Sequence, residues 1–487
     1  MIPKIPEEVK KIAEKLIGES HQAYLVGGCV RDLLLKREPK DWDVATDAPP
    51  VEIQRIFPES VYENEFGTVG VKTDSEDEKL KVIEITTFRL EGRYSDKRHP
   101  DEVKFAKTIE DDLGRRDFTI NAIAFNLRKS DFLRTDSYGG QEDLKNRIIR
   151  TVGDPNKRFE EDALRLMRAV RFAVEMGFSI DRATLAAIKN QAGLLEMIAK
   201  ERIRDELMKI IMTLRAAEGI ILLEDTGLLK YIIPELREGI GCGQNKHHIY
   251  TVFDHNVRAL NYAAEKNYSL EVRFASLLHD VGKPRTKRGD GPDSTFYNHE
   301  TVGARLAVKI LDRLRFPKEI LDKVVHLVRC HLFYYNVGEV TEAGVRRFLS
   351  RVGPENVDDL LKVREADRIG SGVPKAFPYK LRHLLFMIEK VKHDPIHPKM
   401  LKVRGDDVMK ILKIEAGPKI GKILAILLEE VLDDPKKNGK DYLEKRVKNL
   451  GGLADKVLGE LAEKARETKE EFEGGVEEEM KRKYYVK

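Results

Sequence analysis

The arrangement of apolar residues changes near Gly153, and this change constrains the fold more than any other feature. Before it, short apolar runs alternate with helical stretches, as in AYLVGG, VRDLLLK, WDVAT, TVGVKT, KVIEITTF and AIAFNL. Such runs are typical of the strands and helices of an α/β or α+β domain. After it, apolar residues recur with the period of amphipathic helices, as in LRLMRAVRFAVEMGF and IRDELMKIIMTL. The sequence therefore predicts an α/β (α+β) head followed by an all-α remainder.

The chain is too long for a single domain. Its 487 residues exceed what one hydrophobic core usually organises. Turn residues and changes of pattern place soft boundaries near Gly153, Glu224 and His397. The predicted domains are a head (1–153), a helical neck (154–224), a helical body (225–397) and a helical tail (398–487). The last segment, ETKEEFEGGVEEEMKRKYYVK, is predicted to be a frayed helix or a solvated tail.

Charge and cysteine content exclude several classes of protein. Charged residues make up 35% of the chain and hydrophobic residues 41%, which excludes a disordered chain. The net charge of +4 is too small to require a polyanionic partner, although local basic patches can bind phosphate. Three widely spaced cysteines indicate neither a disulfide framework nor a thiolate zinc site. Because no segment approaches the roughly 18 apolar residues of a membrane span, we expect a soluble, cytoplasmic protein. The oligomeric state is not indicated.

A glycine turn and a pair of carboxylates stand close together in the first fifty residues. AYLVGGCVRDLLL predicts a strand, a turn at Gly27 and Gly28, and a helix, which can present backbone amides and Arg31 to phosphate. KDWDVAT places Asp41 and Asp43 two residues apart, so that a strand would turn both carboxylates to one face. Two such charges need a cation, and Mg²⁺ prefers oxygen ligands of this kind. Taken alone, each motif is better explained by a tight turn and an exposed strand end.

Together these motifs resemble a known family. LVGGCVRDLLL followed by PKDWDVAT resembles the opening motif of the class II CCA-adding enzymes and bacterial poly(A) polymerases, which are polymerase-beta-like nucleotidyltransferases. LGRRDFTINAIAFN, GDPNKRFEEDALRLMRAVRFA and ERIRDELMKI resemble later motifs of that family, in the same order. The resemblance implies a nucleotidyltransferase head that adds nucleotides to the 3′ end of an RNA, above all transfer RNA, by two-metal catalysis.

The resemblance also implies which residues bind the nucleotide and its metal. Asp41 and Asp43 would be catalytic and would bind Mg²⁺. The implied nucleotide-binding residues are Gly27, Gly28, Arg31, Arg116, Asp117, Asn121, Glu161, Asp162, Arg165, Arg168 and Arg171. Without the family, the RRD segment that ends at Asp117 is explained equally well as a helix start with an N-cap aspartate.

One segment suggests how the protein could choose its nucleotides. EEDALRLMRAVRF is predicted to be one helix, in which residues 161, 165 and 168 share a face. A carboxylate beside an arginine matches the exocyclic amine and ring acceptor that cytosine and adenine share, and mismatches uracil and guanine. The segment resembles the EDxxR motif of the family, which implies selection of CTP and ATP. Arg168 and Arg171 would continue the basic face and hold phosphate. The alternative is a set of exposed salt bridges.

Two further stretches bear on the product. The segment between Thr87 and Lys107, FRLEGRYSDKRHPDEVKF, resembles the flexible loop that full CCA-adding enzymes need for the terminal A. ESVYENEFGTVGVKT, after Phe57, resembles the CCA-adding pattern more than the basic stretch of poly(A) polymerases. We therefore expect addition of CCA or of its terminal A, and a poly(A) polymerase or an A-adding enzyme remains an alternative.

Seven of the twelve histidines cluster in the predicted body. They are His247, His248, His255, His279, His299, His326 and His331. His255, the His279–Asp280 pair of LLHDVGKP and Asp367 of READRIG resemble the H…HD…D metal site of HD-domain phosphohydrolases, with His299 and His331 as further candidate ligands. Imidazole and carboxylate suit nickel, cobalt, manganese, iron or zinc. The resemblance implies a phosphohydrolase that processes RNA ends. A competing interpretation makes this hydrolase the main activity and the head an RNA-binding platform.

The expected partners are CTP, ATP and the 3′ acceptor end of transfer RNA. Helical parts would recognise the acceptor arm by its shape and backbone, because the A-form major groove admits little side-chain readout. The lysine-rich segment VRGDDVMKILKIEAGPKIGK is the predicted contact. A solvated helical face explains this segment almost as well.

Overall fold

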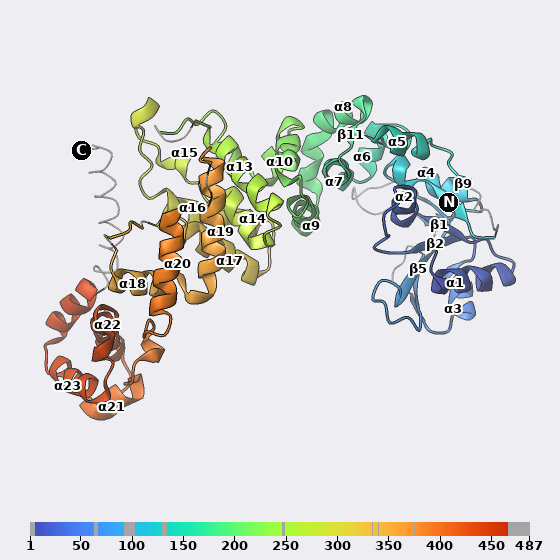
Figure 1. The fold of residues 1–487 in the computed structure, drawn as a ribbon. Coiled ribbons are helices and arrows are strands. Elements are labelled where there is room, and N and C mark those ends of the chain that lie inside the picture. The colour runs from blue at the N-terminus through green and yellow to red at the C-terminus, as the bar shows by residue number, and fades with distance from the viewer. Residues whose placement is uncertain are drawn as a thin grey trace. The chain divides into compact units, whose positions relative to one another are not determined.

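The computed structural model describes residues 5–62, 67–91, 103–128, 134–245, 249–333, 335–338, 340–374, 376 and 378–465. The chain divides into two compact units (Figure 1). The first comprises residues 1–237 and 310–316, and the second residues 238–309 and 317–487. The finer boundaries expected near 153, 224 and 397 stay predictions.

The first unit begins with a mixed sheet of seven strands in the order β3-β4-β5-β2-β1-β8-β9. β2 and β5 are parallel and all other neighbours are antiparallel. The strands are β1 (Tyr24–Val26), β2 (Asp43–Thr46), β3 (Ser60–Tyr62), β4 (Thr68–Lys72), β5 (Val82–Thr87), β8 (Ala124–Asn126) and β9 (Arg134–Thr135). A separate hairpin pairs β6 (Arg89–Glu91) with β7 (Val103–Phe105). This sheet confirms the predicted α/β (α+β) head.

Five helices accompany the sheet: α1 (Glu7–Gly18), α2 (Gly28–Leu34), α3 (Pro50–Ile56), α4 (Ile109–Gly114) and α5 (Gly140–Asn146). The apolar runs of the sequence form the core of the head. The three residues of β1, for example, are all buried. Tyr24 and Val26 of β1 pack with Ala45 of β2, Phe88 and Leu113 in one buried cluster. The carboxylate-bearing strand β2 is thereby fixed between β1 and β5.

The rest of the first unit is helical, as predicted. It contains α6 (Pro155–Glu161), α7 (Leu164–Met176), α8 (Arg182–Gln191), α9 (Lys200–Ile211), α10 (Ala216–Asp225), α11 (Leu229–Ile232) and α12 (Pro234–Arg237), with one short parallel pair of β10 (Ile148–Ile149) and β11 (Ser179–Ile180). Asp154 caps α6 by accepting a hydrogen bond from the backbone N–H of Asn156, and Pro155 occupies the first turn. These local signals start a helix at Pro155, close to the change of pattern in the sequence.

The second unit is all-α within the described residues. Its helices are α13 (Val252–Glu265), α14 (Leu270–Leu278), α15 (Lys283–Thr286), α16 (His299–Arg313, whose last residues group with the first unit), α17 (Lys318–Cys330), α18 (Glu342–Val352), α19 (Val357–Gly370), α20 (Tyr379–Val391), α21 (Gly405–Leu412), α22 (Pro418–Asp433) and α23 (Lys440–Gly451). Thr251 and Ser269 cap α13 and α14 through their hydroxyl oxygens.

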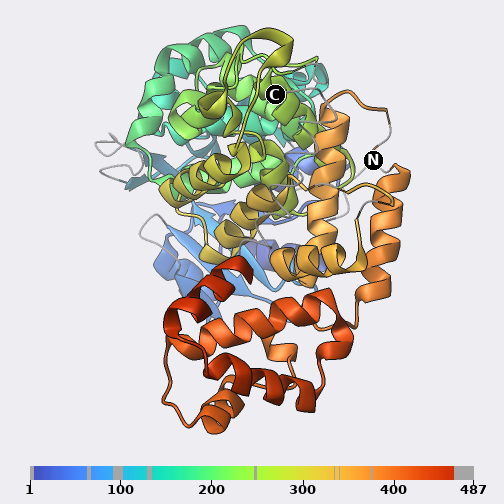
Figure 2. The same cartoon turned by 90° about the vertical axis from the view of Figure 1, so that its left-hand side faces the viewer.

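The C-terminal helices α21, α22 and α23 form a core of their own, drawn in orange-red in Figure 2. Val408, Ile423, Leu427 and Val447 are fully buried there. Among the helices that the structure describes, none combines the length and the apolar composition that a bilayer crossing requires.

Candidate active site and metal centre

A sharp turn joins β1 to α2. Gly27 has a φ of +76°, in the left-handed region that favours glycine. A Cβ atom built on Gly27 would lie 3.0 Å from Nη1 of Arg116 and 3.2 Å from Oδ2 of Asp43. A Cβ atom on Gly28 would lie 3.6 Å from Oδ1 of Asp41. The two glycines therefore leave room for a ligand at a point bordered by both carboxylates and a guanidinium.

Both carboxylates reach this turn, but only Asp43 belongs to the strand. β2 begins at Asp43, and the exposed Asp41 lies in a bend before it. The prediction that one strand carries both residues was therefore wrong, whereas the two side chains do border the same turn, as expected.

The electrostatics of this pair favour a divalent cation. Burial and the charge of Asp41 raise the pKa of Asp43 to about 7, against the opposing effect of Arg116. A bound cation would relieve this repulsion and keep both carboxylates ionised. The hard oxygen donors fit Mg²⁺, which uses a few carboxylates and completes its shell with water and phosphate.

A hydrogen-bonded chain connects the head with the neck. Arg31 donates to Oδ1 of Asn121 at 2.9 Å, and Asn121 donates to Oδ1 of Asp117 at 3.2 Å. Arg168 of α7 donates to Oδ2 of Asp117 through Nε at 2.8 Å and Nη2 at 2.6 Å. Burial opposes ionisation of Asp117, but the nearby guanidinium groups of Arg168 and Arg165 lower its pKa to about 2. Hydrogen bonds thus join four of the predicted nucleotide-binding residues, Arg31, Asn121, Asp117 and Arg168, in one network.

The RRD segment is not a helix start. α4 ends at Gly114, so Arg116 and Asp117 follow that helix, and a short 3-10 turn (Thr119–Asn121) comes next. The buried carboxylate of Asp112 accepts a hydrogen bond from Nη2 of Arg116 at 3.2 Å. The alternative of an N-cap role for Asp117 was therefore wrong, and the backbone instead aims Arg116 at the glycine turn.

The EDxxR segment is not one continuous helix. α6 ends at Glu161, the backbone of Asp162 is extended with φ −140° and ψ 104°, and α7 begins at Leu164. The predicted pair of Glu161 and Arg165 nevertheless forms, with Nη1 of Arg165 at 2.6 Å from Oε2 of Glu161. The expected single helix was wrong, because the break places Asp162 before α7, where its Oδ1 accepts a hydrogen bond from the backbone N–H of Leu164 at 3.0 Å.

Arg202 of α9 holds Asp162 and was missed in the sequence. Its guanidinium donates to both carboxylate oxygens, at 3.2 Å from Nη1 to Oδ1 and 2.8 Å from Nη2 to Oδ2. The ERIRDELMKI motif contains Arg202, but its distance of forty residues from Asp162 gives no local sign of the pairing. Arg202 thus fixes the position of the Asp162 carboxylate, while Arg165 stays paired with Glu161.

Three arginines share the ring of Phe172, which sequence reasoning also missed. The guanidinium carbons of Arg31, Arg168 and Arg171 lie 5.3, 5.2 and 4.0 Å from the ring centroid. Arg171 additionally donates to Glu206 at 2.7 Å, so it is tied to α9 rather than directed at the glycine turn. The aromatic face gathers positive charge beside the site, because cations are attracted to the π face.

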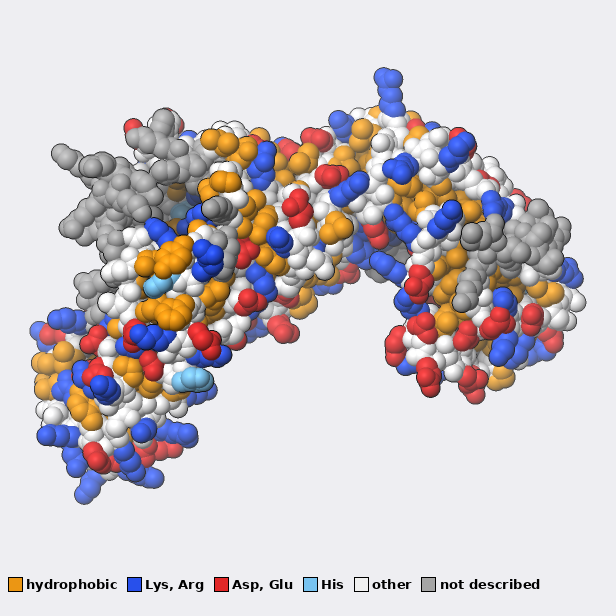
Figure 3. All heavy atoms as spheres, in the orientation of Figure 1, with side chains coloured by type: hydrophobic (Ala, Val, Ile, Leu, Met, Phe, Trp, Pro, Cys, Tyr) orange, Lys and Arg blue, Asp and Glu red, His pale blue; other side chains and the backbone are white. Residues whose placement is uncertain are grey.

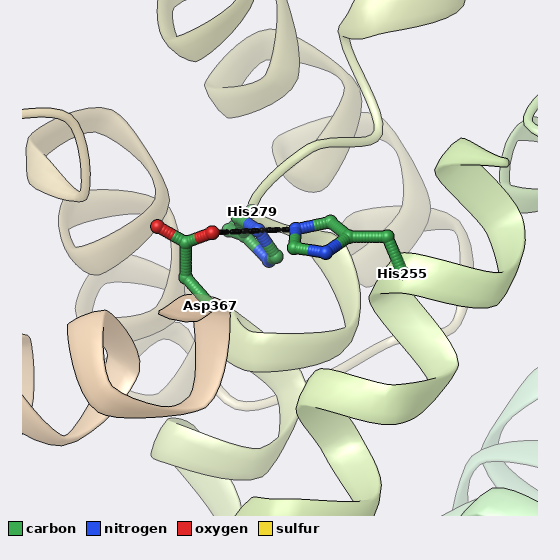
Figure 4. Close-up of side chains that lie close together, drawn as sticks. All are labelled: His255, His279 and Asp367. Atoms are coloured by element: carbon green, nitrogen blue, oxygen red, sulfur yellow. Dashed lines mark hydrogen bonds and ion pairs between the residues drawn. The ribbon is translucent and has the colours of Figure 1, made fainter. Parts of the chain in front are cut away.

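A second constellation lies in the second unit. His255 of α13 and Asp367 of α19 point toward one another with His279 between them (Figure 4). Nε2 of His255 lies 2.9 Å from Nε2 of His279 and 3.3 Å from Oδ1 of Asp367. All three side chains are almost completely buried. The structure thus brings these three predicted core ligands together around one point, and Oδ2 of the fourth, Asp280, lies 3.4 Å from Nε2 of His279.

Asp280 connects this group to a second one. Its Oδ2 lies 3.2 Å from Nε2 of His255, while its Oδ1 lies 3.3 Å from Nε2 of His299 and 3.6 Å from Nε2 of His331. Within each group, His255–His279–Asp367 and Asp280–His299–His331, the donor atoms lie within 4.8 Å of one another. Nζ of Lys283 lies 2.6 Å from Oδ2 of Asp280.

The protonation of these histidines fits metal binding. Burial lowers the pKa of His299 to about 4, which leaves the neutral imidazole that a metal requires. Burial alone would lower the pKa of His279, but Asp280 and Asp367 raise it to about 10. A metal cation beside Asp280 and Asp367 would take the place of the proton on His279. The imidazole and carboxylate donors suit a divalent transition metal.

Several predicted elements do not join either site or cannot be placed. Nε2 of His326 donates to the backbone carbonyl of Val352 at 2.6 Å, and His326 takes no part in the two ligand groups. His247, His248, residues 92–102 of the predicted loop and the segment 466–487 lie outside the described residues. The segment VRGDDVMKILKIEAGPKIGK falls on α21 and the start of α22, and its role in RNA contact stays a prediction.

Family models of known proteins match three successive regions of the chain, in the order expected from the sequence. Residues 23–150 match the poly A polymerase head domain, residues 177–240 match a probable RNA and SrmB-binding site of polymerase A, and residues 252–370 match the HD domain. The head model covers the glycine turn and both carboxylates, and the HD model covers all six buried ligands.

Full-length relatives and a solved structure agree with this division. An A-adding tRNA nucleotidyltransferase of Deinococcus radiodurans is 36% identical over 84% of this chain and 91% of its own length. A CCA-adding enzyme of Staphylococcus saprophyticus is 30% identical over 91% of this chain and 98% of its own. The crystal structure of the Bacillus stearothermophilus CCA-adding enzyme in complex with CTP has a TM-score of 0.67 and 29% identity, covering 91% of this chain and 96% of that one. The chain therefore belongs to the family of tRNA nucleotidyltransferases that comprises the CCA-adding and A-adding enzymes, and it carries an HD domain after the helical neck.

Proposed function

We propose that the head adds C and A nucleotides to the 3′ end of transfer RNA, using CTP and ATP without a nucleic acid template. The observation that carries this proposal is the meeting of Asp41, Asp43 and Arg116 at the glycine turn. The CCA-adding and A-adding relatives and the CTP complex of a similar enzyme support the substrate class.

The side chains around the turn have the chemistry that this transfer needs. Asp41 and Asp43 would hold Mg²⁺, which when bound helps the RNA 3′-hydroxyl attack and stabilises the leaving pyrophosphate. Arg31 and Arg116 would hold the triphosphate, since guanidinium groups match phosphate oxygens. Asn121, placed by Arg31 and Asp117, would contact the ribose. The 3′-oxygen then forms a bond to the α-phosphorus as the bond to pyrophosphate breaks.

Base selection would use the break between α6 and α7. Asp162 is held by Arg202 and Arg165 by Glu161, so an acceptor and a donor are both fixed before a base arrives. A carboxylate accepts from the exocyclic amine of cytosine or adenine, and a guanidinium donates to the adjacent ring nitrogen. Uracil and guanine would instead set a carbonyl against the carboxylate and an N–H against the guanidinium, so that acceptor faces acceptor and donor faces donor.

The number of nucleotides added is tested by product length. Transfer RNAs lacking A, CA or all of CCA are incubated with labelled CTP, ATP or both, and the products are sized. Growth to CCA and no further supports a CCA-adding enzyme, whereas extension of only the substrate that lacks A supports an A-adding enzyme. A long A ladder supports a poly(A) polymerase. No incorporation into any of the three RNAs would contradict the proposal.

A second candidate function is favoured by the two ligand groups that share Asp280. We propose that the HD domain binds a divalent transition metal and hydrolyses phosphoesters at RNA ends. A cation at such a site supplies an activated water at neutral pH. The test is hydrolysis of a 2′,3′-cyclic phosphate RNA end with nickel or manganese, by the wild type and His279→Ala. Equal rates for both proteins, or no hydrolysis by either, would contradict this activity.

The competing interpretation, in which the hydrolase is the main activity and the head only binds RNA, makes the opposite prediction for the head. If it holds, Asp43→Ala leaves RNA extension unchanged. A cytoplasmic location stays a prediction.

A further inference from the structure

Helix α20 carries an exposed aromatic array outside every region that the family models match. Those models end at residue 370, and α20 spans Tyr379–Val391. The ring of His383 lies 5.9 Å from that of Tyr379 and 6.0 Å from that of Phe386, between centroids. Tyr379 is 61% exposed and Phe386 62%, whereas Leu384 on the opposite face is buried. The helix thus packs through its aliphatic face and presents its rings to solvent.

A buried tyrosine, Tyr335, holds the central ring of the array in place. The ring of Tyr335, which is 8% exposed, lies 5.9 Å from the ring of His383, and its hydroxyl lies 2.5 Å from Nδ1 of that histidine. A contiguous group of exposed apolar side chains often marks an interaction site. A buried tyrosine that fixes the central ring indicates that the array is built as a platform.

Two basic side chains lie within the stretch that carries the array, and Glu389, one turn after Phe386, pairs with Lys392 at 3.2 Å. From Tyr379 to Ile388 the helix sequence contains Lys380 and Arg382 and no acidic residue. The guanidinium carbon of Arg382 lies 5.9 Å from the ring centroid of Tyr379. Figure 3 shows hydrophobic and histidine side chains gathered over α20, with both basic and acidic side chains near them. Rings next to cations complement a partner that has both flat π faces and negative charge.

We propose that this aromatic face of α20 is an RNA-binding platform on which unpaired bases stack, while Lys380 and Arg382 approach the phosphates. Bases stack on aromatic side chains regardless of sequence, and RNA recognition favours single-stranded loops whose bases can be splayed out. The inference rests on the proposed function, since it takes the RNA to be the transfer RNA substrate. An apolar protein partner would not need the cations or the flat rings.

The decisive variant is the double replacement Tyr379→Leu/Phe386→Leu in the full chain. Leucine keeps apolar area but has no π face, so stacking is lost while simple hydrophobic docking survives. We expect the dissociation constant for transfer RNA to rise about 10-fold or more, because stacking of a single base accounts for a change of that size. Tyr379→Trp/Phe386→Trp should bind as the wild type does. The matched control is Tyr442→Leu, a partly exposed ring on α23.

A second RNA separates this inference from the proposed function. An acceptor-stem duplex with a 3′ overhang and no loops should bind the wild type and the double leucine variant equally, and both should extend it. Replacing a loop base of the transfer RNA by 2-aminopurine should give quenching on binding to the wild type and none with the double variant. If neither RNA is extended by the wild type, the proposed function fails.

The platform itself is overturned if the double leucine variant binds and quenches transfer RNA like the wild type while both proteins extend it. A change in oligomeric state by light scattering, with unchanged RNA affinity, would assign the face to protein contact and would equally overturn the inference.

Discussion

Replacing Phe172 by leucine removes the ring that Arg31, Arg168 and Arg171 share. The ring is almost completely buried and also contacts Phe118 edge to face, at 5.6 Å between centroids. Leucine retains most of the apolar volume but has no π face to attract a cation. We expect Arg31 and Arg168, which keep their hydrogen bonds to Asn121 and Asp117, to be held less firmly beside the glycine turn, and nucleotide binding to weaken.

The size of the effect follows from the contacts. A cation–π contact at a partly exposed site contributes about 0.5–1 kcal/mol. Arg171 is tied to Glu206 and Glu175 rather than directed at the glycine turn. Only Arg31 and Arg168 are therefore counted, and they keep their hydrogen bonds to Asn121 and Asp117. Two contacts amount to about 1–2 kcal/mol, which corresponds to a reduction of kcat/KM of about 5- to 30-fold.

The assay compares nucleotide addition by Phe172→Leu for CTP and ATP separately. Both should fall by the same factor, because the two nucleotides share the triphosphate that the arginines would hold. Pentafluorophenylalanine at residue 172 should reproduce the loss without changing the shape of the side chain. Phe125→Leu is the matched control, since Phe125 is equally buried and its ring carries Arg134 at 5.6 Å in another part of the head.

The reasoning is refuted if kcat/KM for Phe172→Leu falls no further than for Phe125→Leu. It is also refuted if only one of the two nucleotides is affected, because that result would point to contact with the base.

Three further perturbations test other parts of the structure. Arg202→Met should lower kcat/KM for CTP and ATP by about 10-fold or more, since Asp162 loses two charge-assisted hydrogen bonds; unchanged kinetics would show that the pairing is incidental. Asp280→Ala should reduce bound metal in both HD ligand groups, measured by elemental analysis, while leaving extension of RNA by the head intact; full retention of metal would count against the site. The pKa of Asp117 is lowered to about 2, so its ionisation stabilises the fold above the usual carboxyl pKa and this contribution is lost as the pH falls from about 4 toward 2. The difference in urea midpoint between wild type and Asp117→Asn, followed by the fluorescence of the single tryptophan, Trp42, should shrink over that range, and a constant difference would contradict the assignment.

The local features of the fold could be predicted because they depend on neighbouring residues. The apolar run before Gly27 and the amphipathic run after Gly28 specify a strand, a turn and a helix within a dozen residues. The periodicity after Asp154 likewise specifies helices, and the His279–Asp280 pair identifies the HD site. Each of these signals acts over one or two turns of chain.

The remaining features depend on contacts between distant segments. Helical periodicity extends through Asp162, yet the helix breaks there and Arg202 of α9 holds the carboxylate. No spacing in the sequence specifies that pair, nor the gathering of arginines on Phe172. The sequence pattern also predicts a strand that includes Asp41, whereas β2 begins only at Asp43.

The sharing of Asp280 between two ligand groups is also a tertiary feature. The motif specifies the residue, but its two oxygens point to different groups only because α16 and α17 bring His299 and His331 to one side of the carboxylate. The resemblance to HD domains identifies these histidines as candidate metal ligands, and the structure gives their distances from Asp280.

The most direct test of the account is incorporation of labelled CTP and ATP into a transfer RNA that lacks CCA, by the wild type, Asp43→Asn and the matched control Asp47→Asn. Asp47 lies just after the other end of β2 and accepts a hydrogen bond from the backbone of Gln22 at 2.7 Å. The account predicts that the wild type and Asp47→Asn add nucleotides and that Asp43→Asn adds none with Mg²⁺. Nucleotide addition by Asp43→Asn at the rate of the wild type would contradict it.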